Sequence, residues 1–164
     1  PYCFDGYYID KDFEDKSLKS GGWTTQKIVG TLDWTLGTHG GNYAQMSNYD
    51  GGNSKSETWF ISPVLDVADA ENLSFSFDNA CNYNGDDITV WVSTNYDGVS
   101  NPNSVGTWTQ LSATLSSGNW EWVNSGTIDL SAYCSHTTYV AFKYTGSDSD
   151  GKTWEIDNIV VKKQ

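Results

Sequence analysis

The sequence contains no arginine, and its nine lysines are outnumbered by 21 aspartates and glutamates, which gives a formal net charge of −12. A surface of that sign repels the phosphates of nucleic acids and of anionic membranes. The planar guanidinium groups that read bases or clamp phosphates are also missing. We therefore expect no nucleic-acid partner and no binding to an anionic membrane surface. Divalent cations, or neutral ligands such as sugars, suit this charge better.

Long apolar runs are missing as well. No stretch approaches the roughly 18 to 20 residues that cross a bilayer, so we expect no membrane span. The opening residues Pro1–Phe4 show neither the basic start nor the apolar segment of a secretory signal peptide. We interpret residues 1–164 as a single domain, mature or excised from a longer secreted protein whose other domains would be its neighbours.

Cysteines are few, and their spacing excludes two kinds of site. Cys3, Cys81 and Cys134 form no CxxC pair, which argues against a thiolate zinc site and a dithiol redox motif. The odd count leaves two alternatives open: one disulfide with one free thiol, or three buried thiols.

Catalytic motifs are also absent. His39 and His136 lie in Gly- and Ser-rich segments with no GxSxG or HExxH around them. A nucleophile pair made of Cys134 and His136 would lack the third group that usually orients the base. We therefore expect a binding protein rather than an enzyme.

Glycine and aromatic residues are abundant: 16 Gly, 10 Tyr, 8 Trp and 6 Phe, against a single Met. This composition favours turns and pleated surfaces over helices. The segment 73–78 alternates strictly, which places Leu73, Phe75 and Phe77 on one buried face. Similar or weaker strand patterns occur at 58–62, 88–93, 108–111, 120–123, 127–130, 139–144 and 154–161. About eight to ten strands separated by turn residues favour an all-β sandwich or barrel over any α/β fold.

The first fifty residues are less regular than the rest. Their glycine pairs at 21–22 and 40–41, with a third at 51–52, are typical of loops. We expect long loops here, held against the sheets by Trp23 and Trp34.

A series of short motifs carries a family resemblance. In chain order they are Phe13-Glu14, Trp23, "TWFISPVLD" at 58–66, "LSF" at 73–75, "VWVSTNY" at 90–96, "WTQL" at 108–111, "IDLS" at 128–131, "VAFKY" at 140–144 and "WEIDNI" at 154–159. This succession resembles the cleaved-adhesin and choice-of-anchor J domains, a MAM-like jelly-roll group of secreted Bacteroidetes-type proteins. The likeness covers about Asp12 to Val161 and departs from the family pattern at Cys134, where a small residue is more usual. It implies an all-β fold, an antiparallel two-sheet sandwich of jelly-roll type. It also implies a secreted or cell-surface accessory domain that serves in adhesion, in ligand capture, or as an attachment beside an enzyme.

The resemblance also implies a bound calcium ion. The matching family positions are the glutamate after the first aromatic residue, Glu14, and the aspartate of "EIDNI", Asp157. In a jelly roll the first and last strands can lie side by side, and two carboxylates brought together there repel each other unless a cation sits between them. Solvated acidic side chains in an acidic protein are the alternative.

The aromatic residues predict a second kind of site, one for sugars. Carbohydrate sites offer aromatic faces for stacking, with amides and carboxylates for the hydroxyl groups. Trp91 falls on the strand face opposite Ile88, Val90 and Val92, so it is either covered by another segment or exposed for a ligand. The residues that we expect at a glycan site are Trp91, Tyr83, Asn82, Tyr96, Trp120 and Trp122, with Trp120 and Trp122 on one face of a strand. A protein partner bound by an adhesion domain, and a purely structural spacer, remain alternatives.

Overall fold

The computed structural model describes residues 3–164, which fold into two stacked antiparallel sheets with no α-helix among them. The strands are β1 (Tyr7–Lys11), β2 (Thr24–Val29), β3 (Thr35–Gly37), β4 (Tyr43–Ser47), β5 (Ser56–Ile61), β6 (Leu73–Asn82), β7 (Thr89–Ser93), β8 (Trp108–Leu111), β9 (Val123–Asn124), β10 (Ile128–Asp129), β11 (Tyr139–Gly146) and β12 (Thr153–Lys163), with a short 3-10 helix, η1 (Ser131–Tyr133). The all-β sandwich predicted from the sequence is confirmed.

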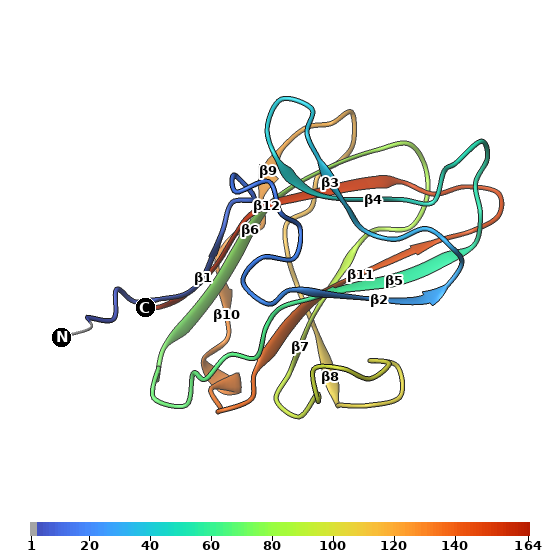
Figure 1. Cartoon of the computed structure of the whole chain (residues 1–164). Helices are drawn as coiled ribbons and strands as arrows, with labels where there is room; N and C mark the ends of the chain where they lie inside the picture. The colour runs from blue at the N-terminus through green and yellow to red at the C-terminus, as the bar shows by residue number, and fades with distance from the viewer. Residues whose placement is uncertain (1–2) are drawn as a thin grey trace.

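The upper layer in Figure 1 is a seven-stranded sheet. Five of its strands follow the order β10-β6-β12-β4-β3, and β1 and β9 are the other two, paired with β12 and β6. Strand β12 is its centre: β6 pairs along one edge, while β4 and then β1 pair with successive parts of the strand. A bulge interrupts the β12–β6 pairing between Asp157 and Val160. The lower layer is a five-stranded sheet in the order β2-β5-β11-β7-β8.

Aromatic side chains fill the space between the sheets. Leu73, Phe75 and Phe77 of β6 are fully buried, as their alternation predicts. Phe142 of β11 meets both rings of that strand edge-on, at centroid distances of 6.1 and 4.9 Å. Burial of such side chains stabilises the fold by about 1.5–3 kcal/mol each.

The first fifty residues contain four strands, so the prediction of long loops there was wrong. Strand β2 escaped the pattern analysis because it is an edge strand in which no residue is fully buried, and β3 has only three residues. Trp23 and Trp34 do not lie over the sheets. They pack inside the core on Phe60, Trp23 in a stacked arrangement at 4.6 Å.

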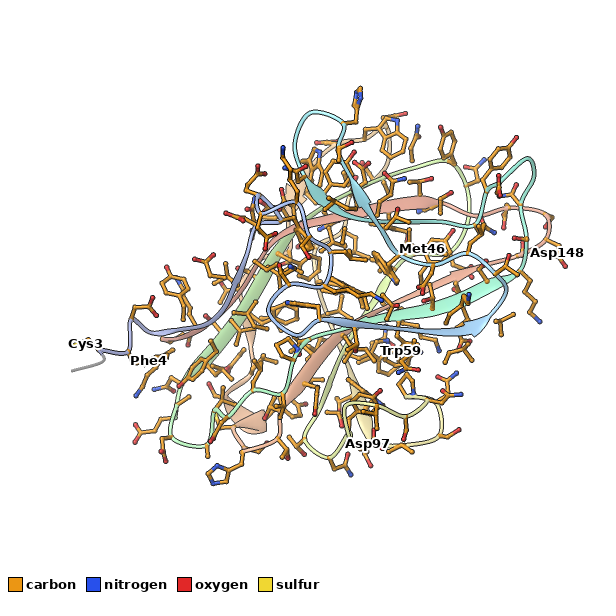
Figure 2. All side chains as sticks on the ribbon, in the orientation of Figure 1. Cys3, Phe4, Met46, Trp59, Asp97 and Asp148 are labelled. Carbon is orange, nitrogen blue, oxygen red and sulfur yellow. The ribbon has the colours of Figure 1, made fainter. Side chains whose placement is uncertain are left out.

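A second aromatic cluster lies on the outer face of the five-stranded sheet, separate from the main core. Trp59 of β5 contacts Trp91 of β7 and Trp108 of β8, at ring distances of 6.0 and 5.1 Å. Tyr96 and Tyr139 complete the cluster. Figure 2 marks Trp59 on this outer side and Met46 between the two sheets.

The three cysteines are free: Cys81 is buried, Cys134 is partly buried and Cys3 is exposed. Neither alternative drawn from the odd count therefore holds, since there is no disulfide and only one thiol is fully buried. Within residues 3–164, no helix has the length and apolarity needed to cross a membrane.

Candidate functional site

A cleft of about 800 Å³ opens on the outer face of the seven-stranded sheet. Its floor comes from strands β4 and β12, where Ser47 pairs with Thr153. Its walls come from the loops that follow β4, β6 and β11 and from the loop before β9. The lining residues are Gln45, Ser47, Tyr49, Asn53, Tyr83, Asn84, Trp120, Ser149, Asp150, Gly151 and Thr153.

One wall of the cleft carries a pair of aromatic rings at right angles. The rings of Tyr83 and Trp120 lie 5.7 Å apart at 89°, and their residues are 63% and 39% exposed. Both residues have left-handed backbone conformations, with φ of 72° and 59°, and Asn119 beside Trp120 has φ of 55°. For bulky side chains this conformation costs about 1–3 kcal/mol, and such strain is concentrated at ligand-binding sites.

The loop that presents Trp120 is fixed from beneath. The Trp120 amide donates to the Cys81 carbonyl oxygen at 2.9 Å. Ser116 holds the start of the same loop, because its amide donates to Asn79 Oδ1 and its hydroxyl donates to the Glu121 carbonyl oxygen. The exposed ring is therefore held in one orientation rather than free to collapse onto the surface.

The opposite wall is built around Asn48, which is fully buried. Its amide nitrogen lies 2.9–3.1 Å from the carbonyl oxygens of Ser54, Ser147 and Asp150, so one side chain ties the β4–β5 loop to the β11–β12 loop. Its Oδ1 accepts a hydrogen bond from Asn53, a lining residue. This arrangement positions the 64% exposed ring of Tyr49 across the cleft from Trp120.

Of the six residues that the sequence predicts for a glycan site, two line this cleft and two lie near it on the same sheet. Tyr83 and Trp120 line the cleft, and Asn82 ends β6 in register with Thr153 on its floor. Trp122 is 42% exposed further along the same sheet, edge-on to Tyr43 at 5.6 Å. The predicted strand over 120–123 is wrong, because β9 begins only at Val123 and the left-handed backbone places both tryptophans in a loop.

Trp91 and Tyr96 do not join that site. Both belong to the cluster on the outer face of the five-stranded sheet, where Trp91 is partly covered and Tyr96 is buried. The prediction that Trp91 faces away from Val90 and Val92 is confirmed, and the tryptophan is covered by aromatic neighbours. The sequence reasoning missed Tyr49, Gln45 and Asn53, although a tyrosine next to the Gly51–Gly52 turn is a signal for an exposed ring.

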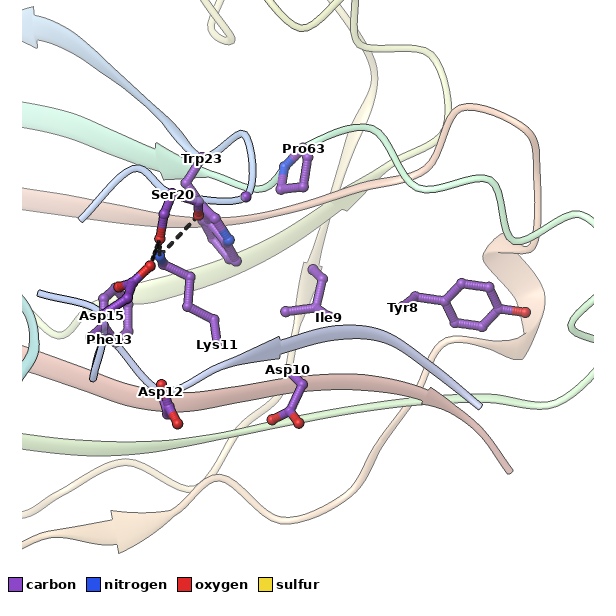
Figure 3. A pocket seen from close by; sticks show the side chains of 11 residues that line it. Tyr8, Ile9, Asp10, Lys11, Asp12, Phe13, Asp15, Ser20, Trp23 and Pro63 are labelled. Atoms are coloured by element: carbon purple, nitrogen blue, oxygen red, sulfur yellow. Dashed lines mark hydrogen bonds between the residues drawn. The ribbon is translucent and has the colours of Figure 1, made fainter. Parts of the chain in front are cut away.

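A second, smaller cavity of about 350 Å³ surrounds Lys11 (Figure 3). The buried ammonium group donates to the carbonyl oxygens of Ser17 and Ser20 and to the Ser20 hydroxyl, at 3.0–3.2 Å. Burial lowers the pKa of Lys11, while Asp15 and Asp12 act in the opposite direction. This cavity holds an internal cation and its aromatic walls, Phe13 and Trp23, are buried, so it offers less to a sugar than the larger cleft.

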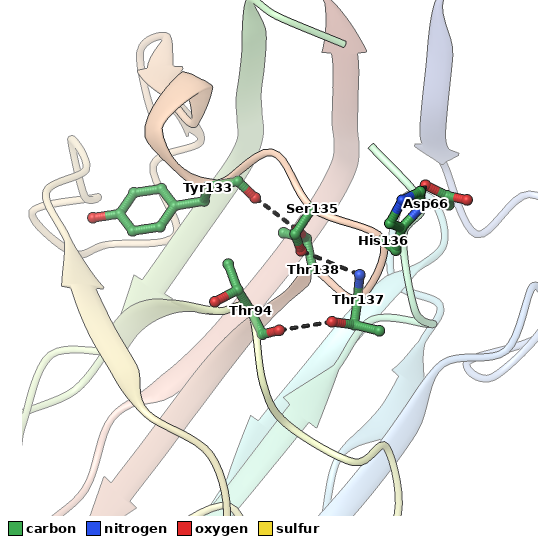
Figure 4. A network of polar contacts seen from close by, with 7 residues as sticks. All are labelled: Asp66, Thr94, Tyr133, Ser135, His136, Thr137 and Thr138. Carbon is green, nitrogen blue, oxygen red and sulfur yellow. Dashed lines mark hydrogen bonds and ion pairs between the residues drawn. The ribbon is translucent and has the colours of Figure 1, made fainter. Parts of the chain in front are cut away.

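The polar network around His136 gives no sign of a nucleophile (Figure 4). His136 Nδ1 lies 2.9 Å from Asp66 Oδ1, and both side chains are more than 70% exposed. Ser135 pairs instead with Thr138, whose hydroxyl donates to the Tyr133 carbonyl oxygen. Cys134 has its Sγ near the Glu71 carbonyl oxygen, 4.0 Å away. These contacts fasten the loop between η1 and β11.

The carboxylates of Glu14 and Asp157 lie in the same region, as the predicted pairing of the first and last strands requires. Strand β1 pairs with β12 through Lys11 and Ile159. Burial, together with the charges of Asp78, Glu14 and Asp12, raises the pKa of Asp157 to about 6, although a hydrogen bond from the Asn158 amide acts in the opposite direction. Within residues 3–164, however, no three carboxylate, thiol or imidazole groups have the spacing of a metal site. A cation at Asp157 would need backbone and amide oxygens as its remaining ligands.

Comparison with known proteins agrees with the fold. The cleaved adhesin domain K3 of Lys-gingipain from Porphyromonas gingivalis is 18% identical, with a TM-score of 0.64 over 94% of this chain and 96% of that one. TmCBM61, solved in complex with β-1,4-galactotriose, is 13% identical, with a TM-score of 0.63 over 96% and 99%. The CBM22-1 xylan-binding domain from Paenibacillus barcinonensis Xyn10C is 14% identical, with a TM-score of 0.56 over 98% and 97%.

These neighbours confirm the jelly-roll sandwich and the resemblance to cleaved adhesin domains that the sequence motifs predict. A search of curated proteins found no match. A family model described as a domain of unknown function, DUF5017, matches residues 23–164, which is most of the chain. The chain therefore belongs to the DUF5017 family.

Proposed function

We propose that this domain is a non-catalytic glycan-binding module that serves as an accessory part of a secreted or cell-surface protein. The observation that carries the proposal is the Tyr83–Trp120 pair, two exposed rings held at a cleft in left-handed backbone conformations. Both rings are open to solvent instead of packed in the core, which is the arrangement that stacking on a sugar ring requires. The cleft adds amides at Gln45 and Asn53, which suit sugar hydroxyl groups.

Two further observations support a sugar over a protein as the partner. Among residues 3–164, nine large hydrophobic side chains are exposed, and four of them belong to this face of the seven-stranded sheet. The other five are Phe4, Tyr7, Val29, Val64 and Val99. A protein-binding adhesion surface would present a broader apolar patch. The structural neighbours TmCBM61 and the CBM22-1 domain are carbohydrate-binding modules, whereas the Lys-gingipain domains are named as adhesins.

Affinity electrophoresis against a polysaccharide panel tests this proposal. We expect retardation in gels that contain a neutral polysaccharide such as xylan, β-1,4-galactan or a mixed-linkage glucan, because stacking and neutral hydrogen bonds dominate the cleft. Tyr83→Ala removes half of the aromatic pair and should restore free migration. If no polysaccharide retards the wild type, the glycan proposal falls and a protein partner takes its place.

We propose in addition that a calcium ion binds beside Asp157 and Glu14. The support is electrostatic: Asp157 is half-buried, and burial together with the charges of its acidic neighbours raises its pKa to about 6. Because this value lies above that of an unfolded aspartate, protonated Asp157 stabilises the fold below about pH 4. That contribution is lost as the pH rises through about 6. At neutral pH a bound divalent cation would offset the cost of burying the charged Asp157 carboxylate, and it would stabilise the native state by mass action.

Thermal melts of wild type and Asp157→Asn, each in chelator and in excess calcium, test whether calcium binds beside Asp157. In chelator at pH 7, the asparagine should stabilise the fold by about 1–2 kcal/mol, after allowance for partial exposure. Asp15, Asp97 and Asp129 have lowered pKa values and act oppositely, but they are common to both proteins and cancel in the comparison. Calcium should raise the wild-type midpoint only. An equal rise in both proteins, or in neither, would refute the site.

A further inference from the structure

The outer face of the seven-stranded sheet continues beyond the cleft, and its side chains follow a regular register. Glu155 is the next outward residue of β12 after Thr153, because Trp154 and Ile156 on either side of it point into the core. In the sheet Glu155 lies between Gln45 of β4 and Ala80 of β6. One outward position further along β4 is Tyr43, which pairs with Gly37.

Tyr43 and Trp122 form a second aromatic pair at this end. The Tyr43 ring lies directly over Gly37: a Cβ at that position would fall 2.6 Å from Cδ2 of the ring. Trp122 stands edge-on to the ring, at 64° and 5.6 Å, and its own ring is open to solvent. Tyr43 is buried beneath it, so Trp122 is the surface that a ligand would meet.

Between the two aromatic pairs lies a carboxylate. Glu155 is 7% exposed, and the Tyr43 hydroxyl is one of its polar neighbours. Burial raises the pKa of Glu155, and the Tyr43 hydroxyl and His39 oppose the rise. Where a ligand hydroxyl reaches its small exposed part, this carboxylate can accept a hydrogen bond, and its charge repels a second carboxylate.

We infer that the glycan site has a second aromatic station at Trp122 and Tyr43, with Glu155 between the stations, so that its ligand is an extended neutral glycan chain. This inference rests on the proposed function. Ser47 and Tyr43 are four residues apart on β4, which corresponds to about 13 Å at the rise per residue of a β-strand. Trp120 and Trp122 are close together in one loop, so this length is set by the cleft floor and not by the two rings. No single sugar ring spans the roughly 13 Å from Ser47 to Tyr43, so a ligand that lies on the cleft floor and also reaches Trp122 has roughly three or more units.

The charges of the side chains on this face favour a neutral glycan over an acidic one. The eleven residues that line the cleft include one carboxylate, Asp150, and no lysine or histidine. Glu155 adds a second carboxylate to the path and Glu121 lies next to Trp120. A uronic-acid polymer would bring its own negative charges onto this surface without a cation to receive them, so it should be rejected.

Isothermal titration with xylo-, cello- and β-1,4-galacto-oligosaccharides of two to six units, and with trigalacturonate, tests the inference. The wild type should gain affinity sharply at about three units and bind no trigalacturonate. Trp122→Ala should lose about tenfold for the longer chains while the short ones are unchanged. Phe4→Ala, an equally exposed aromatic outside both stations, is the matched control and should bind like the wild type.

Glu155→Gln is a second test of the same inference. It keeps the shape of the side chain, so it remains informative if Trp122→Ala fails to fold. It should weaken the longer neutral chains about threefold to tenfold, since a carboxylate is the stronger acceptor. Binding of neutral chains with no loss in either variant would overturn the second station and leave the proposed function intact. Absence of binding to every oligosaccharide by the wild type would overturn the proposed function itself.

Discussion

Gly151→Ala is expected to lower the free energy of unfolding by about 3 kcal/mol or more, with a fall in melting temperature of about 10 °C. A Cβ at this position would overlap Asn48 Oδ1 and lie 2.6 Å from its Nδ2. Asn48 has no space to yield, because it is fully buried and its amide bonds to three carbonyl oxygens from two loops. The substitution therefore combines overpacking with the loss of buried hydrogen bonds.

Gly52→Ala is the matched control for this prediction. Gly52 lies in the same pair of loops, its backbone is outside the left-handed region, and nothing stands within 4 Å of an added Cβ. Chemical denaturation should place its stability within about 0.5 kcal/mol of the wild type. Equal stability of the two alanine variants would show that Asn48 does not lock the cleft wall.

Trp120→Ala should produce the largest loss of glycan affinity, about 30-fold or more, with little change in melting temperature. A central aromatic residue at an interface typically contributes about 2 kcal/mol or more when truncated, which corresponds to that factor. The residue is 39% exposed, lies edge-on to Tyr83 and belongs to neither apolar core cluster, so its removal leaves no core cavity. The backbone strain at φ of 59° persists in alanine, which keeps the loop geometry comparable.

Titration of a neutral oligosaccharide into Trp120→Ala, beside Phe4→Ala, measures this effect. Phe4 is 45% exposed and lies at the far end of the molecule (Figure 2), so its variant should bind normally. An unchanged affinity in Trp120→Ala would remove the aromatic pair from the site.

The strands with strict alternation could be predicted from the sequence. Leu73, Phe75 and Phe77 occupy the face that the period of two assigns them, and Trp91 faces away from Val90 and Val92 as expected. These predictions succeed because one buried face dictates the register of a strand. Edge strand β2 carries no such signal, since none of its residues is fully buried.

The candidate site could be predicted only in part. Tyr83 was predicted as an aromatic residue in a loop, whereas Trp120 and Trp122 were predicted on one face of a strand and in fact lie in a loop. Tyr49 and Asn53 were not found, because their placement depends on Asn48, whose carbonyl partners at Ser147 and Asp150 are 99 and 102 residues away in sequence. Trp91 and Tyr96 were assigned to the same site because no local pattern shows which outer face a residue reaches, nor what covers it.

Two-dimensional NMR of the tryptophan indole N–H groups during titration with a neutral oligosaccharide tests the central claim most directly. The eight tryptophans are distributed over the core, the outer cluster and the proposed site, so their signals report on three separate places. A glycan bound on the seven-stranded sheet should shift the signals of Trp120 and Trp122 and leave those of Trp59, Trp91 and Trp108 unchanged. Shifts confined to Trp91 and Trp108 would place the ligand on the opposite face and contradict this account.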